Sequence, residues 1–185
     1  MHRGNRHGRS EQARQAVLEA ADDLLVEKGF AQLTIEGIAQ RAGVAKQTIY
    51  RWWPSKTDVL FDAFLLDAAE EIQIPATGDM VEDWRGYLRS LARFLTSSDA
   101  GVVFRTLLAE SQHDPALAAR LREMPLPVPA APARPMPGLP DSPVAEWVDR
   151  LVGPIYYRAL VTGADIPDDF VDRLVTATLR PSSPA

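Results

Sequence analysis

The sequence contains no cysteine among its 185 residues, which excludes disulfide bonds, thiol nucleophiles and thiolate metal sites. No apolar run approaches the ~20 residues that a membrane-spanning helix needs, so we expect no membrane partner. The three histidines, His2, His7 and His113, lack the spacing of metal ligands, and no serine or carboxylate stands in a catalytic arrangement. We therefore expect neither an enzyme nor a protein with a metal or cofactor. The basic N-terminus is not followed by the apolar stretch of a secretory signal, so a cytoplasmic location is the simplest interpretation.

Charge is distributed unevenly along the chain. The formal net charge is −5 at pH 7. Residues 1–56 carry nine Lys or Arg against six Asp or Glu, whereas residues 57–185 carry eleven against nineteen. A basic N-terminal part joined to an acidic body is typical of a nucleic-acid-binding module attached to a domain with another task.

Hydrophobic periodicity predicts helices and no strand, hence an all-α fold. The predicted helices cover about residues 11–28, 35–42, 46–53, 56–72, 80–96, 99–113, 115–124, 144–162 and 168–180. Thr34 is placed to cap the second helix and Gly43 to end it. Residues 1–9 are predicted to form a flexible basic arm. Eight prolines within residues 125–143 cannot continue a helix, so this segment is predicted to be an extended connector.

The segment GVAKQTIYRWWPSK, residues 43–56, combines apolar, aromatic and basic side chains in one short helix. Ile49 and Trp53 lie four residues apart and are predicted to face inward. The side chains then predicted to point outward are Lys46, Gln47, Tyr50 and Arg51. Such a face suits the major groove of DNA, where Lys or Arg donates to guanine and Gln pairs with adenine. Thr34 and Lys56 stand at the N-termini of the flanking helices, whose free amides can receive phosphate oxygens.

The stretch LTIEGIAQRAGVAKQTIYRWWPSKTDVL resembles the DNA-binding domain of the TetR family of bacterial transcriptional repressors. The resemblance covers about residues 10–60, including the A-G-V turn, the T-I-Y core and the W-P-S-K entry to the fourth helix. By position, the family's recognition-helix contacts match Lys46, Gln47, Thr48, Tyr50 and Trp52, and its phosphate contacts match Thr34 and Lys56. Ala45 departs from the pattern, because family members often have Ser or Thr at this position.

The resemblance implies an all-α homodimer with two functional parts in each subunit. Residues 10–56 would form the three-helix helix-turn-helix DNA-binding domain, and residues 57–185 a helical regulatory and dimerisation domain. The stretch LVGPIYYRALVTG followed by FVDRLV resembles the end of one TetR C-terminal subgroup, whose last two helices pair with their copies. The predicted dimer contacts are Trp147, Leu151, Ile155, Phe170 and Leu174, although core packing within the subunit is an alternative for the aromatic ones.

Candidates for an effector pocket are the apolar residues of the middle helices. They are Trp84, Tyr87, Phe94, Phe104 and Leu108, which an ordinary packed core explains equally well. Family members normally have a long helix where this chain has its proline-rich segment. This departure leaves three alternatives for the ligand pocket in this chain, which is open, altered or lost.

The sequence as a whole predicts a ligand-responsive, dimeric DNA-binding repressor. Its expected partners are a near-palindromic double-stranded operator, a second copy of the chain and a small-molecule effector of unknown identity. Two alternatives stay open. In one, the chain binds DNA but has lost ligand sensing, as the proline-rich segment suggests. In the other, residues 10–60 are only a packing unit within a helical enzyme or small-molecule carrier that does not bind DNA.

Overall fold

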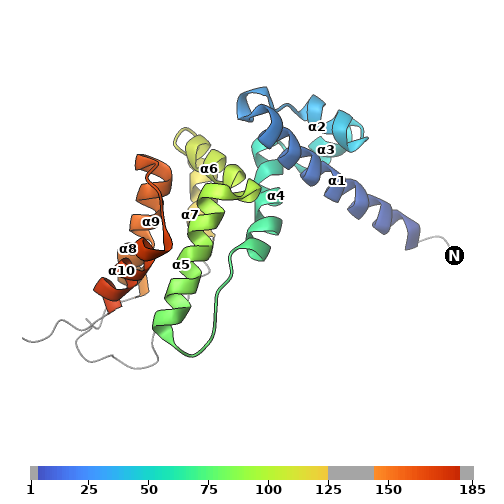
Figure 1. Ribbon diagram of the computed structural model, residues 1–185. Coiled ribbons are helices and arrows are strands. Elements are labelled where there is room, and N and C mark those ends of the chain that lie inside the picture. Colours follow the sequence, from blue (N-terminus) through green and yellow to red (C-terminus); the bar gives the residue numbers. More distant parts are fainter. Residues whose placement is uncertain (1–3, 125–143, 180–185) are drawn as a thin grey trace, which may run out of the picture. The chain divides into compact units, whose positions relative to one another are not determined.

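The computed structural model describes residues 4–124 and 144–179, and these residues form helices without any strand (Figure 1). The predicted all-α fold is therefore confirmed. The N-terminal helices are α1 (Gly4–Lys28), the 3₁₀ turn η1 (Phe30–Gln32), α2 (Ile35–Ala42), α3 (Lys46–Trp52) and α4 (Lys56–Glu71). They are followed by α5 (Met80–Ser97), α6 (Asp99–Ser111), α7 (Pro115–Glu123), α8 (Val144–Leu151), α9 (Gly153–Tyr157), η2 (Arg158–Thr162) and α10 (Asp168–Leu179). The proline-rich connector predicted at 125–143 lies outside the described residues.

The chain divides into two compact units. The first unit spans residues 1–69 and 99–123 and contains α1 to α4 together with α6 and α7. The second spans residues 70–98 and 124–185 and contains α5, α8, α9, η2 and α10. Because α5 belongs to the second unit, the first is built from two separate stretches of chain. No helix among the residues that the structure describes is long and apolar enough to cross a membrane.

Helix α1 supplies one wall of the first unit's core. Its inward face buries Val17, Leu18, Ala20, Ala21, Leu24 and Leu25. The helix begins at Gly4 rather than at residue 11, so most of the predicted flexible arm over residues 1–9 is helical. The physical reason is that extending an existing helix adds one hydrogen bond per ordered residue without a new nucleation cost.

The turn between α2 and α3 has the predicted local chemistry. Thr34 Oγ1 accepts a hydrogen bond from the Gly37 amide at 3.0 Å, which caps α2. Gly43 ends α2 with φ 67°, a left-handed conformation that glycine adopts without steric cost. Ala45 precedes α3 and provides no side-chain cap, because its methyl group cannot accept a hydrogen bond. These features fix where the short helix α3 begins.

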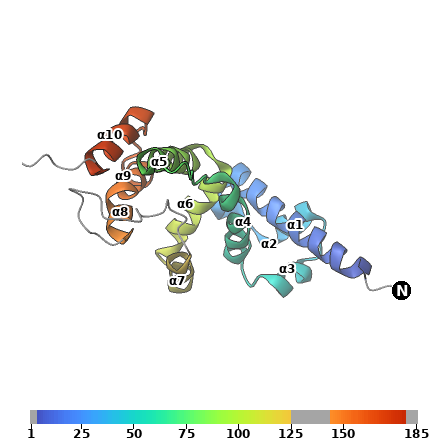
Figure 2. The same ribbon diagram turned by 90° about the horizontal axis from the view of Figure 1, so that it is seen from below.

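Helix α5 forms the spine of the second unit. Figures 1 and 2 both show α9 and α10 beside it, and its buried face includes Trp84, Tyr87, Leu88, Leu91, Phe94 and Leu95. A single helix over residues 144–162 was predicted, but the structure interrupts it at Val152, between α8 and α9, and ends it with the π-helical turn η2. Pro154 lies in the first turn of α9, where its missing N–H is tolerated, so a new helix can start just ahead of the proline.

Candidate nucleic-acid interface

The inward face of α3 is anchored in the core of the first unit. The side chain of Ile49 is completely buried, and Trp53, directly after the helix, is 3 % exposed. The Trp53 indole donates a hydrogen bond from Nε1 to Asp62 Oδ2 at 2.9 Å, so its polar atom is satisfied inside the protein. The rings of Trp52 and Trp53 meet edge to face, with centroids 5.4 Å apart. The predicted inward orientation of Ile49 and Trp53 is confirmed.

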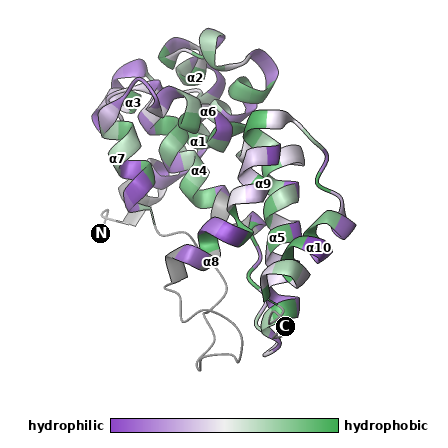
Figure 3. Cartoon of the chain, turned by 90° about the vertical axis from the view of Figure 1, so that its left-hand side faces the viewer, coloured by the Kyte–Doolittle hydropathy of each residue, from purple (hydrophilic) through white to green (hydrophobic). Residues whose placement is uncertain are grey.

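The opposite face of α3 presents polar, basic and aromatic groups to solvent. Gln47 and Arg51 are exposed, and Tyr50 is 48 % exposed although its ring is large. Figure 3 shows the ribbon of α3 mostly at the hydrophilic end of the scale. The Arg51 guanidinium lies 5.0 Å from the centre of the Trp52 ring, which holds both groups on the same surface. Thr48 is half-buried.

An ion pair joins the beginnings of α2 and α3. The Lys46 ammonium donates to Glu36 Oε1 and also lies 5.5 Å from the centre of the Tyr50 ring. The hydrogen bond raises the pKa of Lys46 and lowers the pKa of Glu36, so both groups are charged at neutral pH. The sequence analysis missed Glu36, because an acid in the first turn of a helix is ordinary and carries no signal of a distant partner.

The two residues predicted to hold phosphate make structural bonds within the protein. Lys56 Nζ donates to the main-chain oxygens of Phe30 at 2.7 Å and Leu33 at 2.9 Å. These bonds join the start of α4 to η1 and to the residue directly after η1. The same ammonium lies 3.9 Å from the centre of the Phe30 ring. An ammonium has three donors, so one remains after these two bonds. The Thr34 hydroxyl oxygen is occupied as the cap of α2.

The Asp62 carboxylate has partners in three other parts of the first unit. Asp62 of α4 accepts from Trp53 and also from Arg14 of α1, whose Nη2 lies 2.9 Å from Asp62 Oδ2. A second cation, Arg120 of α7, places its Nη2 3.9 Å from Asp62 Oδ1. The end of α3 is therefore held by a charged group that α1, α4 and α7 share.

The N-terminus of α4 is closed by a reciprocal capping box. The Asp58 amide donates to Ser55 Oγ at 3.2 Å, and the Ser55 amide donates to Asp58 Oδ2 at 3.1 Å. The other carboxylate oxygen of Asp58 accepts from Arg120 Nη1 at 2.6 Å. The Arg120 guanidinium also lies 3.9 Å from the centre of the Phe61 ring. The capping box joins residues three apart, whereas its link to α7 joins residues 62 apart, which no local sequence pattern indicates.

Comparison with known proteins decides what this arrangement belongs to. A family model described as bacterial regulatory proteins, tetR family, matches residues 17–63. An uncharacterized HTH-type transcriptional regulator of Bacillus subtilis, YdeS, is 38% identical over 175 residues, covering 90% of this chain and 88% of that protein. The chain belongs to the TetR family. A second family model, described as a tetracyclin repressor-like C-terminal domain, matches residues 74–136.

The solved structure of the TetR family transcription regulator SCO0332 superposes with a TM-score of 0.70. It is 32% identical in sequence, and the match covers 94% of this chain and all of that one. The tetracycline repressor protein class D of Escherichia coli is 34% identical over 82 residues, which cover 43% of this chain and 36% of that protein. As a TetR-type protein the chain is a DNA-binding transcriptional regulator and not an enzyme.

The residues predicted to line an effector pocket pack in two separate cores. Trp84, Tyr87 and Phe94 are buried in the second unit, with the Trp84 and Tyr87 rings edge to face at 5.7 Å. Phe104 is buried in the first unit, where its ring stacks on another phenylalanine of that unit at 5.2 Å, and Leu108 is half-buried there. Three of the five side chains therefore belong to the core of the second unit and the other two to the first unit.

The predicted dimer residues differ in whether a second copy could reach them. Leu151 and Ile155 are completely buried within the subunit, so they belong to the core of the second unit rather than to a surface. Phe170 is covered by the guanidinium of Arg158 at 3.8 Å, and Leu174 is half-buried. The side chain of Trp147 lies outside the described residues.

Apolar side chains that are exposed in this region are Tyr157, Leu160 and Val161, at 59 %, 38 % and 69 %. The sequence pattern missed these three because helical spacing alone did not show which face of residues 144–162 the core covers.

Proposed function

We propose that the chain is a ligand-responsive, dimeric repressor that inserts α3 into the major groove of a near-palindromic operator. The observation that carries this proposal is the division of α3 into two faces. Ile49 and Trp53 are buried, whereas Gln47 and Tyr50 are exposed. A helix fixed from behind and polar in front has the geometry of a recognition helix. Its site of action is the bacterial cytoplasm, where the DNA lies.

Each exposed group has a chemical role that fits DNA. Gln47 pairs with adenine, and Arg51 donates to guanine or to a phosphate. Tyr50 contacts a thymine methyl with its ring edge or a phosphate with its hydroxyl. Thr48 and Trp52 contact the sugar-phosphate backbone of the DNA at the edges of α3. Lys46 leaves Glu36 and donates to DNA.

The N-termini of α2 and α4 are proposed to seat phosphate oxygens. Free backbone amides and the helix dipole favour an anion at both ends. Thr34 caps the first of these helices, and Lys56 retains one donor after its two bonds to main-chain oxygens. Both residues therefore position protein backbone amides that bind DNA phosphates, and Lys56 also contributes its positive charge.

Dimerisation is proposed to use the exposed apolar surface of α9 and η2. Tyr157 and Val161 are more than half exposed, which leaves apolar area that a second copy would cover. A two-fold dimer presents two copies of α3 to successive major grooves, roughly 34–36 Å apart or a multiple of this distance. Repression, rather than activation, is supported by the relative named as a tetracycline repressor.

A second candidate function is a DNA-binding regulator without ligand response. The tight packing of Trp84 and Tyr87 favours it, because these residues leave no space for an effector between them. A thermal-shift screen with hydrophobic and cationic compounds separates the two candidates. A sensor gains stability with some compound, since a ligand that binds only the native state raises the unfolding temperature.

Selection of bound sequences from random duplex DNA tests the proposed function. We expect enrichment of two half-sites in inverted orientation, because each subunit of a two-fold dimer reads the same bases. The control is Lys46→Glu, with its fold verified by circular dichroism, which should enrich nothing. A wild-type protein that enriches no motif in modest salt would overturn the proposal.

A further inference from the structure

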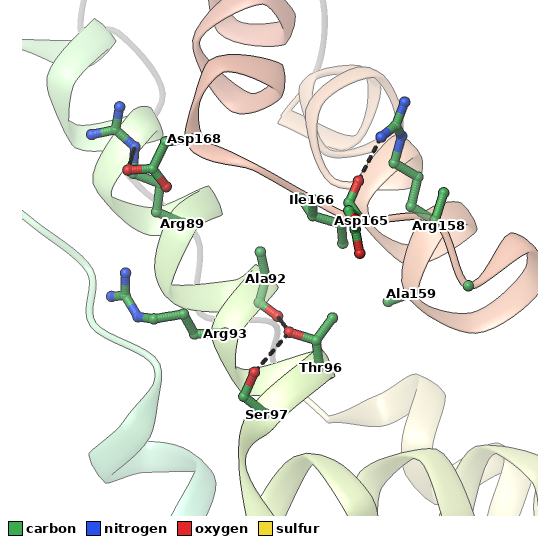
Figure 4. Close-up of a pocket in the computed structure, with 12 residues that line it drawn as sticks. Arg89, Ala92, Arg93, Thr96, Ser97, Arg158, Ala159, Asp165, Ile166 and Asp168 are labelled. Atoms are coloured by element: carbon green, nitrogen blue, oxygen red, sulfur yellow. Dashed lines mark hydrogen bonds and ion pairs between the residues drawn. The ribbon is translucent and has the colours of Figure 1, made fainter.

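The second unit contains a polar cavity of about 370 Å³ between α5 and the segment that joins η2 to α10. Figure 4 shows Arg89, Arg93, Thr96 and Ser97 along α5 on one side, and Arg158, Asp165 and Ile166 on the other. This volume falls within the range of small-molecule sites in proteins, which is about 300–1,000 Å³. The five apolar residues predicted to bind an effector are absent from its lining.

One of the three arginines is already neutralised by carboxylates. Arg89 donates from Nη2 to Asp172 Oδ1 at 2.7 Å, and its Nε lies 3.5 Å from Asp168 Oδ2. These contacts join α5 to α10 within the unit. Arg89 therefore forms a fixed wall of the cavity and contributes little charge to a ligand.

Arg158 keeps its charge available. Its Nη1 donates to the main-chain oxygen of Asp165 at 2.6 Å, and its guanidinium stacks on the Phe170 ring at 3.8 Å. Neither contact supplies a negative charge, and no carboxylate pairs with Arg158 within residues 4–124 and 144–179. The guanidinium has five donors, so four remain for a ligand.

Arg93 is the second available cation. It is exposed, and it forms no ion pair or hydrogen bond with any other residue that the structure describes. It also lines a neighbouring cavity of about 300 Å³ in the same unit, together with Ser90 and Ser97. In Figure 4 its guanidinium extends away from Arg158, so holding a bound group together with Arg158 requires another rotamer of its long side chain.

We propose that this cavity binds a small organic anion whose carboxylate or phosphate group is held by Arg93 and Arg158. Charge favours an anion. The lining contains two arginines without a carboxylate partner, Arg93 and Arg158, and one aspartate without a cationic partner, Asp165. The hydroxyls of Thr96 and Ser97 supply further polar contacts at the α5 wall. Guanidinium groups bind carboxylate and phosphate with paired, charge-assisted hydrogen bonds.

The cavity also indicates the chemical class of the effector, which would be a small organic anion. This second statement rests on the proposed function. Arg158 belongs to η2, between the exposed Tyr157 and the exposed Leu160 and Val161. A ligand held by Arg158 lies behind the surface proposed to meet a second copy. Binding would therefore move the element that sets how the two subunits, and with them the two copies of α3, are spaced.

Isothermal titration calorimetry with inorganic phosphate and with citrate tests the site, in the full-length protein at constant ionic strength. We expect Arg93→Gln to weaken binding about tenfold or more, because a charge-assisted hydrogen bond is lost. Asp165→Asn should strengthen binding about threefold, because a repelling charge is removed. Arg122→Gln is the matched control: this arginine is exposed on α7 of the first unit, and its loss should leave binding unchanged.

Opposite effects of the two cavity variants identify the site. Absence of binding by both anions, or equal weakening by Arg93→Gln and Arg122→Gln, would overturn it. A second arm measures affinity for the selected operator with and without saturating anion. Anion binding that leaves operator affinity unchanged would overturn the effector role and leave DNA binding standing. A protein that binds the anion but no DNA would overturn the proposed function and leave the site intact.

Discussion

Arg120 of α7 donates a 2.6 Å hydrogen bond to Asp58, the acid of the capping box that begins α4. The contact joins two helices of the first unit that are far apart in sequence. Since the same guanidinium approaches Asp62, which binds Trp53 at the end of α3, α7 is connected to the end of α3 through the Asp62 carboxylate. A displacement of α7 is therefore expected to change how α3 is held.

Arg120→Ala should destabilise the protein by about 1 kcal/mol, because Asp58 and Asp62 lose a cation while remaining partly exposed to solvent. Urea denaturation followed by circular dichroism measures this. Arg122→Ala, on the same helix and exposed, is the control and should change the free energy of unfolding by less than about 0.5 kcal/mol. Equal stability of the two variants would show that the Arg120 contacts contribute nothing.

Glu36→Gln should increase affinity for operator DNA about two- to tenfold. The substitution frees Lys46 from its ion pair and removes a negative charge beside the proposed phosphate seat. Fluorescence anisotropy with a labelled operator measures the change, and Glu123→Gln on α7 controls for net charge. Weaker binding by Glu36→Gln would mean that the ion pair positions α3 rather than competing with DNA.

Thr34→Ala should cost about 1 kcal/mol of stability, since the Gly37 amide loses its acceptor at the start of α2. Thr34→Ser retains the hydroxyl and should stay within about 0.5 kcal/mol of the wild type. Thermal and urea unfolding give both values. If the serine variant is as unstable as the alanine variant, the methyl group rather than the cap accounts for the loss.

Asp22 of α1 should make the protein less stable as pH rises. Burial and the nearby Asp67 carboxylate raise the pKa of Asp22 to about 8, from 3.8; Asp23 and Asp99 add smaller effects. Between these values the unfolded chain has lost the proton that the folded protein keeps, so the free energy of unfolding falls with increasing pH. One oxygen of the carboxyl, Oδ1, is buried without a hydrogen-bond partner, which makes the ionised form costly.

Asp22→Asn removes the titrating group and keeps its shape. It should match the wild type near pH 4 and exceed it at pH 8 by at least about 1 kcal/mol. Urea denaturation at several pH values measures the difference. Glu11→Gln, exposed on the same helix, is the control: it retains Asp22 and should therefore keep the pH profile of the wild type. Parallel pH profiles of the wild type and Asp22→Asn would contradict the assignment.

Local chemistry made much of the DNA-binding part predictable. The Thr34 cap, the Gly43 turn and the Ser55–Asp58 box each act within a few residues, so the sequence alone determines them. The spacing of Ile49 and Trp53 likewise predicted which face of α3 is buried. These elements follow from backbone geometry and from the helical repeat.

Features that depend on distant packing could not be predicted in this way. The partners Glu36 and Arg120 carry no local signal, since charged residues on helix surfaces are ordinary. Periodicity placed Leu151 and Ile155 on an apolar face but could not tell a core from a dimer surface. The polar cavity at Arg158 is formed by elements far apart in sequence, and only their three-dimensional arrangement brings its arginines together.

The most direct test of the central claim compares operator and scrambled duplexes with the double variant Gln47→Ala, Tyr50→Ala. Anisotropy at fixed salt should show the wild type binding its selected operator about 1,000-fold more tightly than the scrambled duplex. In the variant, whose fold should be unchanged because both side chains are exposed, this preference should fall at least tenfold. A correctly folded variant that keeps the full preference would contradict the account, because the bases would then be read by some other part of the protein.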